Sequence, residues 1–315
     1  MENSQFSIAF YNVENLFDAI DGPHTLDREF SPKGKKKWGP YRLNHKIQKL
    51  GNAIAKIGRD KSSIPPVLVG LAEVENKTVL QDLLKAEALQ TTPYDFLHYE
   101  SSDERGMDVA LLYNKNYFQP SKSKSIPVFL YDAAKNRDHT RDILHVQGTL
   151  QGEEVHVFVN HWSSKRAGKA IASKHLEIVK TLEREIANIA APDPKILLLG
   201  DFNENPSEQA LQLLAAKSFN NPMEALYAKG LGSSKFYGKW MLFDQILLSK
   251  NFFPPKAKHL QFQEARIFNE PFLQNPKGPF KGQPFRTYSG KYYLGGYSDH
   301  FPVYVVLQVR AHSTL

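Results

Sequence analysis

Apolar runs of strand length that end in polar clusters constrain the fold of this chain most. Residues 66–74 read PVLVGLAEV, and residues 195–201 read KILLLGD. Near-continuous apolar strands of this kind are typical of a sheet covered on both faces. Segments with helical spacing alternate with them; in 42–58, apolar residues recur every three or four positions. This order predicts an α/β fold with buried strands.

The same reading gives the remaining elements. Further strands are expected at 6–13, 107–114, 142–150, 154–162, 241–249 and 301–309, and further helices at 77–89, 169–190 and 207–216. Long segments at 18–41, 115–141 and 250–298 are expected to be loops, which at this length are usually functional or disordered. No linker or internal repeat divides the chain, so residues 1–315 are expected to form a single domain. Periodicity alone suggests a doubly wound parallel sheet.

Composition narrows the possible chemistry. The chain has no cysteine, which excludes disulfides, thiolate nucleophiles and thiolate metal sites. Its formal net charge of +7 favours an anionic partner such as a phosphate-bearing substrate. No apolar run is long enough to span a membrane, and the start, MENSQFSIAF, does not read as a signal peptide. We expect a cytoplasmic monomer without an obligate protein partner.

Acids, amides and imidazoles stand at the ends of six expected strands. They are Asn12 and Glu14, Glu73, Asn160 and His161, Asp201 and Asn203, Asp244, and Asp299 and His300. Each alone has an ordinary interpretation as a turn residue or a hydrogen-bonded structural residue. Together they indicate a site, because carboxylates beside apolar strands are costly to desolvate unless a cation compensates them. Oxygen ligands without cysteine suit Mg²⁺, Mn²⁺ or Ca²⁺ better than Zn²⁺.

The order of these motifs resembles the endonuclease/exonuclease/phosphatase superfamily, which includes deoxyribonuclease I. The motifs are N-x-E, a strand-final E, N-H, G-D-x-N, a D before QILLS, and S-D-H-x-P. The resemblance extends from residue 8 to about residue 307 and is closest to bacterial members that begin with FYNVENLFD and end with GGYSDHFPVY. It implies a four-layer α-β-β-α sandwich of two packed mixed sheets. The active site would lie at one edge, where loops from both sheets meet.

The resemblance also implies a metal-dependent hydrolase of phosphate esters, in which water attacks phosphorus in line with the leaving oxygen. Glu73 matches the principal metal-binding carboxylate. Asn12, Glu14 and Asp299 match groups that complete or support metal binding. Asp201 matches the group that orients or deprotonates the attacking water.

Further residues match groups that contact the phosphate. Asn203 corresponds to an amide donor, and His161 to an imidazole that donates to the phosphate or the leaving oxygen. His300 is expected to pair with Asp244, which would fix its tautomer and stabilise an imidazolium.

Four less specific residues are candidates for phosphate binding: Asn160, Arg141, Lys165 and Arg166. Arg141 precedes an expected strand where relatives place a phosphate-binding arginine, and its alternative is a surface ion pair with Asp138 or Asp142. Lys165 and Arg166 follow His161 closely, and their alternative is a solvated loop.

The substrate is less constrained than the reaction. Residues 250–297 interleave aromatic and basic side chains, which fits either a strand of nucleic acid or a satellite core. The tract KGKKKWGPYR at 33–42 is a second basic patch or a solvated loop. We expect a nuclease or phosphodiesterase; the alternative is a phosphomonoesterase or a lipid or inositol headgroup phosphatase. A non-catalytic binding module is disfavoured, because every expected polar position is filled.

Overall fold

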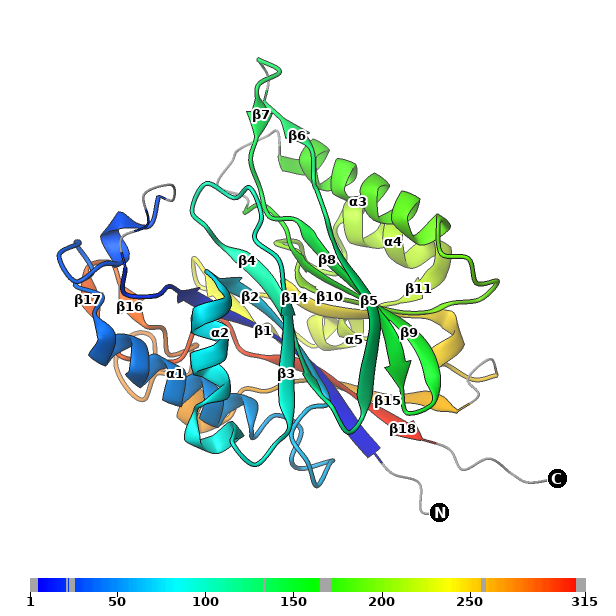
Figure 1. Cartoon of the computed structure of the whole chain (residues 1–315), viewed down its shortest axis with the longest axis horizontal. Helices are drawn as coiled ribbons and strands as arrows, with labels where there is room; N and C mark the ends of the chain where they lie inside the picture. The colour runs from blue at the N-terminus through cyan, green and yellow to red at the C-terminus, as the bar shows by residue number, and fades with distance from the viewer. Residues whose placement is uncertain are drawn as a thin grey trace.

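Figure 1 shows the computed structural model of the chain. The structure describes residues 5–20, 22, 26–132, 134–164, 171–255 and 259–309. Lys165 and Arg166 lie outside the described residues, so their contact with phosphate stays a prediction. Among the helices that are described, none combines the length and apolar character needed to cross a membrane.

Six strands form the first sheet. They are β1 (Gln5–Leu16), β2 (Leu68–Val74), β3 (Tyr94–His98), β4 (Asp108–Asn114), β15 (Leu260–Ile267) and β18 (Val303–Val309). Their order across the sheet is β15-β18-β1-β2-β4-β3. β1 and β2 are parallel, and the other neighbouring pairs are antiparallel. The C-terminal ends of β1 and β2 therefore lie at the same edge.

The second sheet also has six strands. They are β5 (Phe118–Ile126), β8 (Ile143–Leu150), β9 (Glu153–His161), β10 (Lys195–Asp201), β11 (Phe219–Asn220) and β14 (Asp244–Ser249). Their order is β11-β14-β10-β9-β8-β5, and only β9 and β10 are parallel. The ends of β9 and β10 and the start of β14 therefore share one edge.

Short hairpins and helices complete the fold. The hairpins pair β6 (Leu130–Tyr131) with β7 (Arg137–Asp138), β12 (Ser234–Phe236) with β13 (Lys239–Met241), and β16 (Tyr288–Ser289) with β17 (Tyr292–Tyr293). The α-helices are α1 (Pro40–Ile54), α2 (Lys77–Leu84), α3 (Ile171–Ala187), α4 (Gln209–Ser218) and α5 (Met223–Ala228). Single 3-10 turns occur at Arg28–Phe30, Glu87–Leu89, Lys250–Phe252 and Pro271–Leu273.

The two sheets pack face to face through alternate residues of their strands. In β1, Ile8 and Phe10 belong to the core between the sheets. Ala9 and Tyr11 face the other way and pack with residues of α1 and α2. This alternation follows from strand geometry, in which successive side chains point to opposite faces.

β10 shows the same division in the second sheet. Leu197 and Leu199 belong to the central core, whereas Ile196 and Leu198 pack with residues of α3 and α4. Figure 1 shows α1 and α2 on one outer side of the molecule and α3 and α4 on the other. The layers are therefore α, β, β and α, which confirms the architecture that the resemblance implies. The doubly wound parallel sheet suggested by periodicity is wrong, because each sheet has only one parallel pair.

Two segments that the sequence pattern assigns to loops contain strands. β5 lies within 115–141, and β15 lies within 250–298. Both are sheet edges with interrupted registers; in β5 the shift falls between Pro120 and Lys122. Edge strands tolerate proline and exposed polar residues, so they lack the apolar pattern that identifies central strands.

Candidate active site

The core between the sheets ends in polar side chains. Asn12 follows Phe10 by two positions in β1, and Asp201 follows Leu199 by two positions in β10. The alternation that points Phe10 and Leu199 into the central core therefore points Asn12 and Asp201 to the same inner face. Both side chains are buried, 1% and 2% exposed.

Strand register extends this row across the second sheet. Asp201 is paired with His161 on the parallel strand β9 and with Asp244 on the antiparallel strand β14. His161 and Asp244 are also buried. Three chemically active side chains that are far apart in the sequence are thus placed side by side by the sheet itself.

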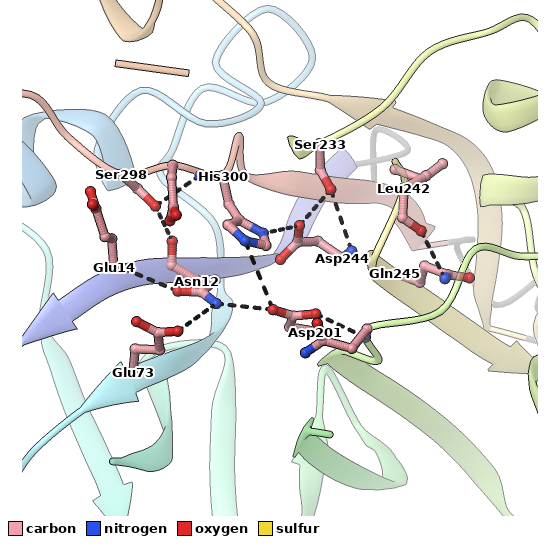
Figure 2. A network of polar contacts seen from close by, with 12 residues as sticks. Asn12, Glu14, Glu73, Asp201, Ser233, Leu242, Asp244, Gln245, Ser298 and His300 are labelled. Carbon is pink, nitrogen blue, oxygen red and sulfur yellow. Dashed lines mark hydrogen bonds and ion pairs between the residues drawn. The ribbon is translucent and has the colours of Figure 1, made fainter. Parts of the chain in front are cut away.

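Asn12 connects the two sheets at this edge (Figure 2). Its Nδ2 donates to Asp201 Oδ2 over 3.0 Å and lies 3.5 Å from Glu73 Oε1. Its Oδ1 accepts a hydrogen bond from the backbone N–H of Glu14 over 3.0 Å. Asn12 therefore fixes the relative position of the two carboxylates expected to act on metal and water.

Glu73 sits at an irregularity in β2, where the pairing with β4 shifts register. Its φ of 64° is in the left-handed region, and its Oε2 accepts the backbone N–H of Asn15 over 2.8 Å. Burial would raise the pKa of Glu73, but coulombic attraction to His161, Arg105 and Arg141 lowers it below its usual value, and because His161 is neutral near pH 7, the two guanidinium groups are the cations that act there. Glu73 is therefore ionised at neutral pH and available to a cation.

His300 and Asp244 form the expected pair. His300 Nδ1 lies 2.6 Å from Asp244 Oδ2, which also accepts the hydroxyl of Ser233. The other ring nitrogen, Nε2, lies 4.0 Å from Asp201 Oδ2 (Figure 2). Burial opposes the charged form of His300, but Asp244 outweighs it and holds the pKa of His300 well above its usual value. His300 is therefore an imidazolium.

Ser298 joins this pair to β1. Its hydroxyl donates to the backbone carbonyl of Asn12 over 2.6 Å and accepts the backbone N–H of His300 over 3.0 Å. Ser298, the serine of the S-D-H-x-P motif, thus orients His300. The periodicity of the sequence does not indicate this role.

Asp201 faces both imidazoles. Its Oδ2 lies 3.8 Å from His161 Nε2 and 4.0 Å from His300 Nε2, and its Oδ1 accepts the backbone N–H of Asn203 over 2.9 Å. Burial, followed by repulsion from Asp244, raises the pKa of Asp201 to about 7. A carboxyl group with this pKa is half-ionised near neutral pH, which suits proton transfer.

His161 has the opposite charge state to His300. Burial and the nearby Arg141 lower the pKa of His161 well below its usual value, so its ring is neutral. Among the described residues, its Nδ1 is a buried atom with no hydrogen-bond partner. The site thus combines a neutral and a charged imidazole on either side of Asp201.

Glu14, the acidic residue of the N-x-E motif, lies beside the buried Lys46. Its Oε2 accepts the backbone N–H of Thr287 over 2.6 Å, while Lys46 donates to the Glu14 carbonyl and, over 2.5 Å, to Thr287 Oγ1. Burial and the charge of Asp299 raise the pKa of Glu14 to about 7. Asp299 is itself paired with Arg286 at 2.9 Å. Lys46 was not expected from the sequence, where it is one of several helical lysines.

The structure gives Arg141 an ion-pair partner that was not expected, and its contact with phosphate stays a prediction. Arg141 pairs with Asp103, Nε to Oδ2 at 2.9 Å, and not with Asp138 or Asp142. Its charge nevertheless acts on His161. Arg105 was missed, because the segment SSDERG reads only as a polar turn; it donates to Asn15 Oδ1 and acts electrostatically on Glu73 and His161.

Asn160 is a correction to the sequence analysis. It is fully buried, and its Nδ2 donates to the carbonyls of Phe158 and Leu199, each over 3.3 Å. Because side chains alternate along a strand, the residue next to His161 faces away from the site. Its contact with Gly200 explains the glycine of the G-D-x-N motif: a Cβ at Gly200 would lie 2.8 Å from the Cβ of Asn160.

Asn203, expected to donate to phosphate, is held within the site loop. Its Nδ2 donates to the carbonyl of Trp162 over 2.9 Å, and its φ is 49°. The amide has a second hydrogen, so the expectation of a phosphate contact stays a prediction.

The aromatic residues of 250–297 serve the core in large part. Phe252, Phe268 and Tyr288 are buried members of three different apolar clusters. Phe280 and Tyr292 are 56% and 66% exposed. Of the two alternatives for this segment, the core role is the one the buried rings support. In the 33–42 tract, Trp38 is likewise buried.

The described residues contain one group of acidic and imidazole side chains close enough to hold a metal ion together: Asp201, Asp244 and His300, with donor atoms within 4.8 Å of one another. His300 Nδ1 and Asp244 Oδ2 are already bonded to each other. This trio therefore fits a hydrogen-bonded relay better than a cation site. Glu73, Glu14 and Asp299 offer only oxygen donors, and mutual repulsion between Glu14 and Asp299 would be relieved by a cation.

Comparisons with solved structures and sequence families found proteins similar to this chain. An endonuclease/exonuclease/phosphatase family protein from Bacteroides thetaiotaomicron has a TM-score of 0.61 and 16% identity, covering 99% of this chain and 100% of that chain. A mannosyl-6-phosphatase from the same organism has a TM-score of 0.58 and 18% identity, with coverages of 96% and 99%. D. rerio TDP2, complexed with a single-strand DNA product, has a TM-score of 0.57 and 19% identity, with coverages of 96% and 99%.

At these identities the likeness to solved structures establishes the fold. The comparison with curated proteins gave no match. The sequence profile of a family described as Endonuclease/Exonuclease/phosphatase matches residues 7–309. The chain therefore belongs to the endonuclease/exonuclease/phosphatase family, whose enzymes hydrolyse phosphate esters with the help of divalent metals.

Proposed function

We propose that this protein is a divalent-metal-dependent phosphodiesterase in which Asp201 activates the attacking water. The observation that carries the proposal is the position of Asp201. Its carboxylate faces a neutral imidazole, His161, and a charged one, His300, at 3.8 Å and 4.0 Å, and it is bonded to Asn12. The base Asp201, the hydrogen-bond donor His161 and the cationic donor His300 thus surround one point where a phosphate would sit.

Asp201 would take the proton of the attacking water. Its pKa, raised to about 7, keeps part of the group ionised at neutral pH while giving it more basicity than an ordinary aspartate. The imidazolium of His300, supported by Asp244, would donate a hydrogen bond to a phosphate oxygen. The neutral ring of His161 would place an N–H on the phosphate or on the leaving oxygen.

Glu73 would hold the metal ion, with Glu14 and Asp299 supporting it from farther away, since these three carboxylates are not grouped within 4.8 Å of one another in the described residues. The ionised state of Glu73 and the all-oxygen donor set fit Mg²⁺ or Mn²⁺, and Ca²⁺ less specifically. When bound, such an ion supplies positive charge to the phosphate oxygens. Asn12 would keep Glu73 and Asp201 in register, since it contacts both carboxylates.

A diester is supported by charge and by a structural neighbour. The net charge of +7 favours polyanionic substrates. D. rerio TDP2, which shares the fold, was solved with a single-strand DNA product. A phosphomonoesterase is the second candidate, because Arg105 and Arg141 place two guanidinium groups near His161, where they would suit a dianion; the fold neighbour from B. thetaiotaomicron is a mannosyl-6-phosphatase.

A substrate panel tests the proposal. Hydrolysis of bis-p-nitrophenyl phosphate, p-nitrophenyl phosphate and a single-stranded oligonucleotide is measured with Mg²⁺, Mn²⁺, Ca²⁺ or EDTA. We expect metal-dependent hydrolysis of the diesters, with kcat/KM above that for the monoester, and little turnover in EDTA. Preference for p-nitrophenyl phosphate in every metal would replace the phosphodiesterase by the phosphomonoesterase.

A further inference from the structure

The hairpin formed by β12 and β13 is anchored on the candidate active site. Ser233, just before β12, donates its hydroxyl to Asp244, and Ser234 forms a β-bridge with His300. The backbone N–H of Phe301 donates to the carbonyl of Ser233 over 2.7 Å. Figure 2 shows Ser233 beside Asp244 and His300. The base of the hairpin is therefore fixed to the residues that hold the imidazolium.

The tip of this hairpin presents two aromatic rings to solvent. Phe236 is 46% exposed and Tyr237 is 92% exposed, and their ring centroids lie 4.6 Å apart at an interplanar angle of 75°. Lys239 is exposed beside them, and the ammonium of Lys235 lies 5.1 Å from the ring centroid of Trp240. Exposed rings flanked by lysines are the components of a stacking surface for nucleic acid.

The conformation of the hairpin turn does not explain why position 237 is a tyrosine. Tyr237 has a φ of 46° and Gly238 a φ of 79°, so both central residues of the turn are left-handed. Two-residue hairpin turns of this kind favour Asn-Gly or Asp-Gly, because bulky side chains are strained in that conformation. A ring is thus held in solvent at a position where the backbone would prefer asparagine.

We propose that Phe236 and Tyr237 bind a base of a single-stranded nucleic acid whose scissile phosphate lies at Asp201 and His300. The inference rests on the proposed function. Tyr237 lies three positions after Ser234, which is at the site, and this is about 10 Å at a strand rise of about 3.3 Å per residue. A nucleotide flanking the scissile bond spans that distance, whereas a small ester does not. Lys235 and Lys239 supply the charge that a phosphate backbone requires.

The composition of the tip favours nucleic acid over a membrane surface. Two rings between two lysines make a small apolar area, whereas interfacial segments bury a broad apolar face in the bilayer. The position of the hairpin beside His300 also ties the rings to a substrate phosphate. A membrane-binding role is kept as an outcome of the test.

Binding measurements on a Tyr237→Asn variant test the inference. The full chain, carrying Asp201→Asn to prevent cleavage, is titrated against a fluorescein-labelled 12-nucleotide single-stranded DNA, and fluorescence anisotropy is read. We expect Tyr237→Asn to weaken Kd on the order of 10-fold, the scale of one lost base–ring stack. Its Tm should stay equal or rise, because asparagine suits the turn. Tyr237→Phe should keep Kd within about two-fold, because the ring is retained.

Tyr131→Ser is the matched control, since Tyr131 is 58% exposed on β6, which contacts α3. It should leave Kd unchanged. In the protein that keeps Asp201 and can turn over substrate, Tyr237→Asn should also lower the ratio of kcat/KM for the oligonucleotide to kcat/KM for bis-p-nitrophenyl phosphate.

The outcomes separate the two proposals. A Kd for Tyr237→Asn within two-fold of the parent, or an equal loss with Tyr131→Ser, overturns the role of the hairpin. So does binding to phosphatidylcholine–phosphatidylserine vesicles that Tyr237→Asn abolishes while DNA binding is kept. Absence of hydrolysis with every substrate and metal refutes the proposed function alone, because anisotropy requires no turnover.

Discussion

Replacing Asp201 by asparagine should move activity and stability in opposite directions. The substitution keeps the shape of the side chain but removes its charge and basicity. Turnover should fall on the order of 10²–10⁴-fold, the usual contribution of a general base. Stability should rise, because the native protein holds this carboxylate in a buried position against Asp244.

The size of the stability change follows from the pKa. Burial and Asp244 raise the pKa of Asp201 from 3.8 to about 7. That difference of about 3 units corresponds to roughly 4 kcal/mol of destabilisation at pH 8, at about 1.36 kcal/mol per unit. The sign is that of a raised acid pKa: the penalty is absent below pH 4 and grows as pH rises towards 7. Asparagine avoids this penalty. It has only one side-chain oxygen for the two donors, Asn12 and the backbone N–H of Asn203, and the lost hydrogen bond lowers stability by about 1–3 kcal/mol.

The net expectation is a gain of roughly 1–3 kcal/mol at pH 8 and a Tm higher by several degrees. Thermal unfolding of both proteins is followed in EDTA at pH 4 and pH 8, since a bound metal would stabilise the carboxylate. The advantage of Asp201→Asn should be largest at pH 8 and vanish or reverse at pH 4. A variant with lower Tm at both pH values, or with near-normal kcat, would show that Asp201 is a structural carboxylate and not a strained base.

Three further substitutions test neighbouring parts of the site. Asp244→Asn removes the charge that raises the pKa of His300, so the alkaline limb of the kcat–pH profile should move to lower pH; an unmoved limb would contradict an imidazolium role. Glu73→Gln should raise the half-saturating Mg²⁺ concentration more than about 10-fold, since even outer-shell groups contribute 10–100-fold; a metal titration giving the parent value would exclude Glu73 as ligand. Asn160→Ala should lower stability by about 1–3 kcal/mol through lost buried hydrogen bonds while changing kcat less than about threefold, and a large kcat loss in folded protein would reverse its assignment as a structural residue.

The sequence was sufficient for the central strands and for most polar residues at their ends. Both KILLLGD and EVHVFVNH are strands that lead directly into Asp201 and His161, and in the second the valines alternate in phase with His161. The phase of the valines therefore predicts which face His161 occupies, whereas the continuous apolar run before Asp201 predicts a buried strand but not the face of its last residue. The same phase, applied strictly, would also have excluded Asn160, because it lies one position out of step with His161.

Other features depend on contacts that no local pattern contains. Lys46 has the sequence context of a surface helix residue, yet it is buried because its ammonium reaches the carbonyl of Glu14 and the hydroxyl of Thr287. Arg105 reaches the site through Asn15, 90 residues earlier in the chain. The edge strands β5 and β15 were missed because a strand paired on one side needs fewer apolar residues.

The backbone at the site explains why local reasoning fails there in particular. Glu14, Asn15, Glu73 and Asn203 all have φ between 49° and 64°, a region that residues other than glycine seldom adopt. Contacts from distant parts of the chain accompany these conformations: the Asn15 N–H donates to Glu73, Glu14 accepts the N–H of Thr287, and the Asn203 amide donates to the carbonyl of Trp162. Strain of this kind persists only where surrounding structure imposes it, and it gathers at functional sites. In β2 the turned residue is Glu73 itself, which places its carboxylate 3.5 Å from the amide of Asn12, whereas Asp201 reaches the same amide from the end of a regular strand.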